Sequence, residues 1–190
     1  MIKKKNIIKD NKIKRVLQEK SILEEVSHPF ILDLKYSFQD MKKIYFVTEF
    51  CQGGELFFHL SKVGHFNEKA IRFYASQIVI IFEYLHSKGI LYKDLKPENI
   101  LVNYDGFIKL ADFGLAEKIS EYKNHVTYDF SGTPQYISPE MISEKGCSYA
   151  SDWWSLGVLL YELGTGVTPF RGKNTKIILK NIYLWKLSLK

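Results

Sequence analysis

Apolar residues at helical spacing predict four helices along the chain. Residues 11–26 carry apolar side chains every three or four positions, as in an amphipathic helix. Residues 67–87 form the longest helical pattern, and Asn67 has the side chain of a helix N-cap. Residues 152–163 are strongly apolar and predict a third helix, and residues 173–190 fit one more.

Four short apolar runs predict two β-hairpins. The runs 34–39 and 43–50 flank a three-residue connection. The runs 100–102 and 107–110 flank Asp105-Gly106, a dipeptide that favours the tight turn of a hairpin. Helices and hairpins together favour an α+β fold.

Four polar residues around the second hairpin carry the candidate chemistry. Asp94 and Lys96 precede Pro97, which excludes a continuing helix, and Asn99 opens the hairpin. Asp112 follows its last strand. A carboxylate that accepts a hydroxyl proton, an ammonium that meets a phosphate and two oxygen ligands for Mg²⁺ are the groups that phosphoryl transfer needs.

These residues stand in an order that resembles the eukaryotic protein kinases. Residues 92–99 (Tyr-Lys-Asp-Leu-Lys-Pro-Glu-Asn) match the catalytic loop H-R-D-L-x-x-x-N, and residues 112–114 are Asp-Phe-Gly. Lys96 follows the pattern of serine/threonine kinases. The tyrosine that begins the loop and the Gly-Thr-Pro-Gln-Tyr of residues 132–136 resemble the AGC group. Ser-Pro-Glu at 138–140 stands for the A-P-E motif.

The resemblance implies an α+β, protein-kinase-like fold. Residues 1–50 would form a partial N-terminal lobe with one helix and a β-hairpin. Residues 51–190 would form the hinge and a partial, mostly helical C-terminal lobe, with the helices that the family names αD to αG.

The resemblance also implies a role for each polar residue of the loop. Asp94 would act as the catalytic base, Lys96 would neutralise the γ-phosphate, and Thr133 would belong to the same catalytic group. Asn99 and Asp112 would bind Mg²⁺. The expected nucleotide is ATP.

The nucleotide contacts implied by the resemblance lie mostly in the hinge. Glu49 and Cys51 would bind adenine through backbone groups, with Thr48 as the gatekeeper and Leu101 as a further contact. Glu19 would be the ion-pairing glutamate of the first helix. From the residues alone, a glutamate among lysines is usually part of a solvated helix face.

The resemblance to AGC kinases implies a protein substrate with a serine or threonine near basic residues. The acidic residues that would receive those basic residues are Glu55, Glu98 and Glu162. The alternative is that these are three unrelated surface glutamates. The sequence does not identify a regulatory partner.

The activation segment differs from the family pattern at one position. Asp129 occupies the place of the threonine that AGC kinases phosphorylate, and Lys93 replaces the arginine expected to pair with it. We expect a weak, constitutive contact between the two, with Thr127 as an alternative phosphorylation site. The resemblance further predicts an apolar stack between the lobes, formed by Leu23, Leu34, Tyr92 and Phe113 and anchored by Asp152.

Two parts of the kinase pattern are missing from the chain. The glycine-rich loop and the lysine that pairs with Glu19 would both precede Met1. One of the lysines at 3–5 could take the place of the lysine that pairs with Glu19, but this is the less favoured interpretation. Without the preceding strand, the hairpin at 34–50 should have an open edge. We therefore expect little transfer by these residues alone. Three hypotheses stay open: a serine/threonine kinase, a kinase-like binding module without catalysis, and a truncated product without its own fold.

Charge and composition add limits on partners. The net charge is +6, but residues 1–20 and 171–190 each carry +6, and residues 21–170 carry −6. This segregation argues against a nucleic-acid partner. No stretch is long and apolar enough to predict a transmembrane segment. Two separated cysteines favour a reducing compartment, so we expect a cytoplasmic location, with the nucleus as a second option.

Overall fold

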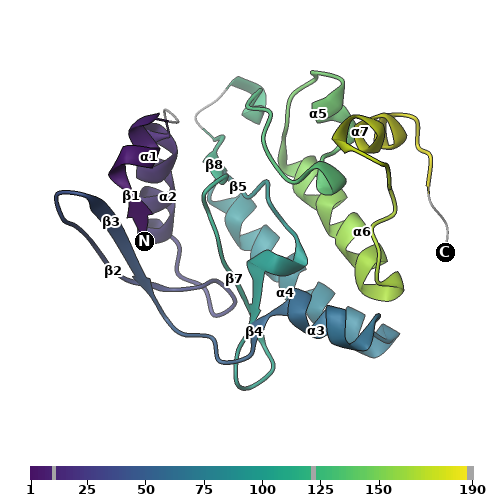
Figure 1. Ribbon diagram of the computed structural model, residues 1–190, viewed down its shortest axis with the longest axis horizontal. Coiled ribbons are helices and arrows are strands. Elements are labelled where there is room, and N and C mark those ends of the chain that lie inside the picture. Colours follow the sequence, from purple (N-terminus) through teal and green to yellow (C-terminus); the bar gives the residue numbers. More distant parts are fainter. Residues whose placement is uncertain (10–11, 121–122, 188–190) are drawn as a thin grey trace.

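The computed structural model describes residues 1–9, 12–120 and 123–187, and its elements fall into two groups (Figure 1). In Figure 1 the N-terminal helices and the first hairpin lie at one side, and the larger helices lie at the other. The first group contains β1 (Ile2–Lys3), α1 (Lys4–Lys9), α2 (Ile13–Glu25), β2 (Leu34–Gln39) and β3 (Lys43–Thr48).

The second group follows the hinge and contains most of the helices. Its helices are α3 (Leu56–Val63), α4 (Glu68–Ser87), α5 (Pro139–Ile142), α6 (Tyr149–Thr165) and α7 (Thr175–Tyr183), with the 3₁₀ turns η1 (Pro97–Asn99), η2 (Lys123–His125) and η3 (Pro134–Tyr136). Its strands are β4 (Gly54–Glu55), β5 (Ile90–Leu91), β6 (Ile100–Val102), β7 (Ile108–Leu110) and β8 (Glu117–Lys118).

The predicted helices are present, with shifted ends. α4 begins after Asn67, whose side chain accepts a hydrogen bond from the backbone N–H of Ala70 at 2.9 Å and so caps the helix. α2 begins at Ile13, because Lys12 already has non-helical backbone angles. α7 is shorter than the predicted 173–190, and residues 188–190 lie outside the described part of the chain.

Both predicted hairpins are also present. β2 pairs with β3, and β6 pairs with β7, antiparallel in each case. Gly106 closes the second hairpin with φ 84°, a left-handed conformation that glycine adopts without strain. A third pair joins β5 to β8, so the strands form three small sheets.

The open edge expected on the first hairpin is covered only in part, at Lys43 and Ile44 of β3. β1 pairs with β3 at Ile2↔Ile44 and Lys3↔Lys43, so the sheet order is β1-β3-β2. The lysine-rich start of the chain therefore continues the sheet before it turns into α1. The family resemblance implied a helix after the hinge, although no apolar spacing was assigned to it, and α3 forms there and buries Leu56 and Leu60.

One apolar core joins the two groups of elements. It includes Ile22 and Leu23 of α2 together with Leu159 and Leu163 of α6. The expected stack lies within it: Leu23, Tyr92 and Phe113 are core residues, and Leu34 packs against them. The rings of Tyr92 and Phe113 meet edge to face at 5.3 Å.

No helix in the described part of the chain is long and apolar enough to span a membrane.

Candidate active site

A buried carboxylate on α6 holds the loop that carries Asp94. Asp152 is fully buried and accepts hydrogen bonds from the backbone N–H groups of Tyr92 at 3.0 Å and Lys93 at 2.9 Å. It also lies 2.8 Å from Nε2 of His86 on α4. Lys93 has φ 72°, a left-handed conformation that a lysine keeps only when its surroundings support it. The contacts of Asp152 therefore fix the backbone just before Asp94.

Asp94 lies at the centre of a network of short polar contacts. Nζ of Lys96 is 2.7 Å from Oδ2 of Asp94, and Oγ1 of Thr133 donates to Oδ1 at 2.7 Å. Nζ of Lys96 also donates to Oγ1 of Thr133 at 3.0 Å. The structure thus brings together the three residues predicted to be catalytic. A fixed carboxylate beside an ammonium suits the transfer of a hydroxyl proton next to developing negative charge.

Asn99 and Asp112 supply the oxygen atoms expected for Mg²⁺. Nδ2 of Asn99 donates to the backbone oxygen of Asp94 at 2.8 Å and to its Oδ2 at 2.9 Å, so the amide oxygen of Asn99 is the group left for a cation. Asp112 is exposed at the end of β7, and its Oδ1 accepts from the backbone N–H of Gly114 at 3.1 Å. Amide and carboxylate oxygens are hard ligands, and this donor set fits Mg²⁺.

Asp94, Asp112 and Glu19 line one cavity of about 490 Å³ beside α2. Burial raises the pKa of Glu19 to about 7, and the charge of Asp112 adds to the rise. Lys12 also lines this cavity, whereas the lysines at 3–5 do not. The structure therefore gives no support to those three lysines as substitutes for the missing cation.

The expected adenine contacts follow β3. The side chain of Glu49 is engaged with Lys109, whose Nζ lies 2.8 Å away, so the backbone of Glu49 is the part left for a nucleotide. Thr48 ends β3, and Cys51 is buried, with a thiol pKa raised by that burial. Leu101 lies on β6, the strand that pairs with β4 directly after the hinge. These residues thus come from two adjacent segments.

Two of the three predicted substrate-binding glutamates lie close together. Glu162 accepts a hydrogen bond from the hydroxyl of Tyr136. Burial raises the pKa of Glu162; the Tyr136 hydrogen bond opposes the rise and the charge of Glu98 adds to it. Glu55 lies at the start of α3, which packs against η1, the turn that carries Glu98. The acidic residues therefore surround one end of the catalytic loop.

Asp129 forms the expected contact with Lys93 and another that was not expected. Nζ of Lys93 is 2.9 Å from Oδ2 of Asp129, and Nη2 of Arg15 is 2.9 Å from Oδ1. The hydroxyl of Ser131 donates to Oδ2 at 2.9 Å. Burial acts to raise the pKa of Asp129, but Lys93, Ser131 and Arg15 together outweigh it, and the net shift is downward. Asp129 is therefore held as a carboxylate.

Thr127 does not suit its expected role as an alternative phosphorylation site. It is only 4% exposed, and its backbone pairs with Cys147 in both directions, at 3.0 and 2.7 Å. Its Oγ1 accepts from the backbone N–H of Asp129 at 3.3 Å. A kinase could reach this hydroxyl only after the segment had left its place.

Arg15 is the site residue that the sequence patterns missed. It is one of eight basic residues among the first 20, and its spacing does not distinguish it from the others. Its partner Asp129 is 114 positions away, so only the fold brings the two together.

A carboxylate bound to a neighbouring ammonium, with two oxygen donors of the kind that Mg²⁺ prefers on the same loop and hairpin, is the arrangement of a phosphotransferase of the kinase class. The chain matches the family model described as the protein kinase domain over residues 1–187. It therefore belongs to the protein kinase family.

Proteins similar in sequence to this chain show to which group of protein kinases it is related. The chain is 43% identical to human 3-phosphoinositide-dependent protein kinase 1 over 183 residues, which are 96% of this chain and 33% of that protein. It is 41% identical to a RAC family serine/threonine-protein kinase homolog of Dictyostelium discoideum over 188 residues, 99% of this chain and 42% of that protein. A probable serine/threonine-protein kinase of Dictyostelium discoideum is 44% identical over 182 residues, 96% and 40% of the two chains.

These relatives are serine/threonine kinases, and the chain is AGC-like among them. Members of the protein kinase family generally use ATP and Mg²⁺ and act on protein substrates. The chain spans less than half the length of each relative named here.

Proposed function

We propose that the protein to which this chain belongs transfers the γ-phosphate of ATP to a serine or threonine hydroxyl of a protein substrate. The observation that carries the proposal is the network around Asp94, in which Lys96 and Thr133 contact different carboxylate oxygens. In this role Asp94 accepts or orients the hydroxyl proton. Lys96 neutralises the negative charge of the transferred phosphate, and Thr133 holds the side chains of Asp94 and Lys96 in position.

Asn99 and Asp112 are the residues that would hold Mg²⁺. When bound, the ion neutralises charge on the phosphates of ATP. Backbone groups at Glu49 and Cys51 would bind the adenine. The buried position of Cys51 supports this assignment, because a buried, protonated thiol packs rather than reacts.

The test is a radiolabelled-phosphate assay on the full-length protein and its Asp94→Asn variant. Loss of a general base lowers the rate by roughly 100- to 10,000-fold, and we expect a loss in that range. Glu83→Gln, at an exposed position of α4, is the matched control and should keep full activity. Undiminished transfer by the Asp94 variant would overturn the assignment.

We further propose that the substrate carries basic residues on the N-terminal side of the acceptor. Support comes from the placement of Glu55, Glu98 and Glu162: α3 begins after Glu55 and packs against the turn that carries Glu98, and the charge of Glu98 acts on Glu162. An oriented peptide library tests the idea. No selection for arginine or lysine, or selection for acidic residues, would contradict it.

A second candidate function is binding without catalysis. Glu19 favours it, because burial and the charge of Asp112 raise the pKa of this side chain to about 7 and so weaken it as a fixed negative charge for a phosphate-binding cation. A protein of this kind would bind nucleotide or partner without Asp94-dependent transfer. The assay above distinguishes the two functions directly.

A further inference from the structure

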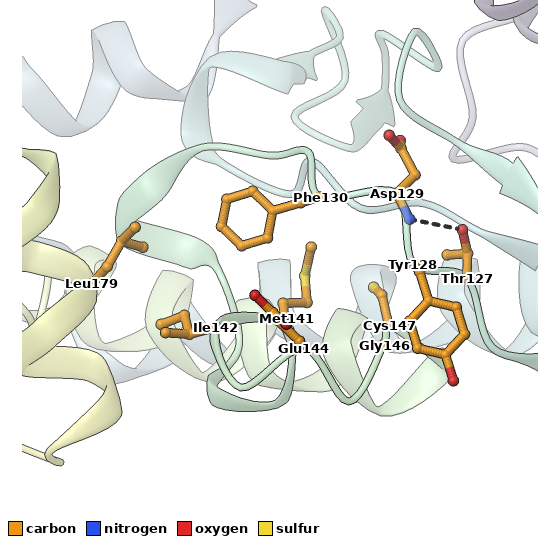
Figure 2. Close-up of a pocket in the computed structure, with 10 residues that line it drawn as sticks. All are labelled: Thr127, Tyr128, Asp129, Phe130, Met141, Ile142, Glu144, Gly146, Cys147 and Leu179. Atoms are coloured by element: carbon orange, nitrogen blue, oxygen red, sulfur yellow. Dashed lines mark hydrogen bonds between the residues drawn. The ribbon is translucent and has the colours of Figure 1, made fainter.

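Two features of the molecule lie outside the Asp94 network. The pocket in Figure 2 is formed by residues 127–130, α5, α7 and the loop at 144–147. Asp129 lines this pocket and is held by Lys93, so the pocket belongs with the activation segment described above. The sheet β1-β3-β2 lies on the other side of the molecule, opposite α5 and α7 (Figure 1), and one of its faces has no part in that site.

This outer face of the sheet is not covered by any element in the described part of the chain. The hydroxyl of Ser37 on β2 donates to Glu24 of α2 at 3.5 Å, so α2 lies against the inner face. Successive side chains of a strand point to opposite faces. Tyr36 and Phe38, on either side of Ser37, therefore belong to the outer face, and both are exposed.

Aromatic side chains gather on the outer face. The ring of Phe38 stacks on that of Tyr45, the residue opposite it on β3, with 4.8 Å between the ring centroids. Tyr36, two positions before Phe38, is 71% exposed. Met41, in the connection between β2 and β3, is 95% exposed and forms an apolar tip. Exposed apolar side chains that lie together mark a contact surface.

The pairing of β1 with β3 brings lysines from two distant segments to the same sheet. Lys3 lies directly opposite Lys43, and the backbone N–H of Lys4 donates to the backbone oxygen of Lys42 at 2.8 Å. Lys43 and Tyr45 are two positions apart on β3, so Lys43 and its partner Lys3 belong to the outer face. Like charges directly opposite each other are unfavourable, and an anion beside them relieves the repulsion.

The positive charge around this face is largely unopposed. Residues 1–9 carry four lysines and no acidic residue (+4), and residues 40–43 carry two lysines and Asp40 (+1). None of these six lysines forms an ion pair with another described residue. Oδ1 of Asp40 accepts from the backbone N–H groups of Lys42 and Lys43, at 2.6 Å each, and so closes the turn. The surface therefore complements an anionic partner.

Apolar and basic side chains together suit an anionic lipid surface better than a nucleic acid. At a membrane surface, lysines meet the anionic headgroups and tyrosine rings lie at the headgroup level. An exposed methionine at the tip of a hairpin gains from burial at the boundary of the acyl chains. A nucleic acid offers no such apolar layer, so the exposure of Met41 favours the membrane.

We propose that the outer face of the β1-β3-β2 sheet binds the surface of an anionic lipid bilayer. Lys3, Lys42 and Lys43 contact the lipid headgroups, and Met41 enters the boundary between headgroups and acyl chains. This binding does not depend on phosphoryl transfer, because none of these residues belongs to the Asp94 network.

The test is sedimentation of the full-length protein with vesicles of phosphatidylcholine, with or without phosphatidylserine. Each lysine that reaches an anionic surface strengthens binding by about fivefold, so we expect a larger bound fraction when phosphatidylserine is present. Added salt should weaken this binding, because it screens the charges. Equal sedimentation with the two kinds of vesicle would overturn the inference.

Paired substitutions locate the basic contact. Lys42→Gln together with Lys43→Gln should weaken binding to the phosphatidylserine vesicles by about 25-fold, the product of two fivefold losses. The matched control removes the same charge by Lys173→Gln together with Lys176→Gln, at exposed positions in and just before α7. Equal losses from the two pairs would show that net charge alone drives binding, and the inference would be wrong.

Met41→Ser tests the apolar contact. It should weaken vesicle binding by about fivefold and leave the salt dependence unchanged, because it removes apolar surface and no charge. Val63→Ser, at an exposed apolar position of α3, is the control. Melting curves show that each variant is folded, and phosphoryl transfer without vesicles should match that of the unaltered protein.

A duplex oligonucleotide separates the membrane from a nucleic acid. If the oligonucleotide binds and the vesicles do not, and if Lys42→Gln with Lys43→Gln removes that binding, the face belongs to a nucleic acid. That result would overturn the inference, as would vesicle binding that Met41→Ser leaves unchanged.

Discussion

Asp129 places a permanent negative charge where the AGC resemblance expects a phosphorylated threonine. A carboxylate carries one charge instead of nearly two, and Lys93 lacks the planar fork of an arginine. Arg15 partly makes up for both losses, because it adds a second cation to the same carboxylate. The segment therefore has an ion-pair anchor that needs no modifying enzyme.

We predict that phosphatase treatment leaves the full-length protein active and that Asp129→Asn lowers its activity. The pair of Asp129 with Arg15 is 41% exposed on each side and contributes up to about 1 kcal/mol, or about fivefold in an ordering equilibrium. Loss of Asp129 should cost more than this, because it also leaves the buried ammonium of Lys93 without one of its partners. Arg15→Gln should have the smaller effect, and the neighbouring exposed Lys14→Gln should have little. Inactivation by phosphatase would show that another phosphorylated residue orders the segment.

Glu19 gives a pH prediction for a polypeptide of residues 1–190. Its folded-state pKa of about 7 lies above the ordinary 4.5, so the folded state binds the proton more tightly than the unfolded state. This contribution to stability is present in full below about pH 4.5 and is lost as the pH rises through 7. Glu19→Gln should flatten the melting temperature between pH 5 and 8, measured with a chelator present. If the pH dependence of the melting temperature stays unchanged in Glu19→Gln, a group other than Glu19 titrates in this range.

At the residue scale, the residues of the catalytic loop could be predicted from the sequence. The residues from distant parts of the chain that contact the site could not. Asp94, Lys96 and Asn99 lie within six positions, so their order alone indicates a site. Arg15 and Lys3 acquire meaning only through residues more than 30 positions away. Thr127 carried a suitable hydroxyl, but its burial depends on a bridge to Cys147 that no local pattern encodes.

At the scale of elements, long periodic segments were predicted best. α4 has 20 residues and a side-chain N-cap, so its apolar face and its start are both visible in the sequence. β1 has two residues, too few for any periodicity, and it forms only because β3 offers an edge. α3 has eight residues and lies directly after the hinge, and only the family resemblance implied a helix there.

The attachment of the catalytic loop to α6 gives a stability prediction. Asp152→Ala leaves the buried N–H groups of Tyr92 and Lys93 without their acceptor, and we expect a loss of about 3 kcal/mol in the free energy of unfolding. Urea unfolding of the full-length protein measures it, with Glu83→Ala as the exposed control. Equal midpoints for the two variants would mean that α6 does not hold the loop.

At the scale of the whole molecule, residues 1–190 contain the catalytic loop but no glycine-rich loop. The phosphates of ATP would lack those backbone donors and the lysine that pairs with Glu19. Loss of a single electrostatic group costs roughly 2.7–4 kcal/mol, or a hundred- to thousandfold in rate. We predict turnover near background for this polypeptide in a radiolabelled-phosphate assay. Robust transfer that Asp94→Ala abolishes would show that another cation, such as Lys12, serves the site.

Two ion pairs tie α2 to the segment that follows Gly114: Arg15 to Asp129, and Glu25 to Lys118. Because these ion pairs join the helix to the loop, their positions are thermodynamically coupled. A shift in the position of one changes the conformational equilibrium of the other. Two ligands that each bind to one of these parts must therefore change each other's affinity by the same factor. If nucleotide binding near Glu19 draws α2 inward and tightens substrate binding along residues 130–136, substrate must tighten nucleotide binding by the same factor.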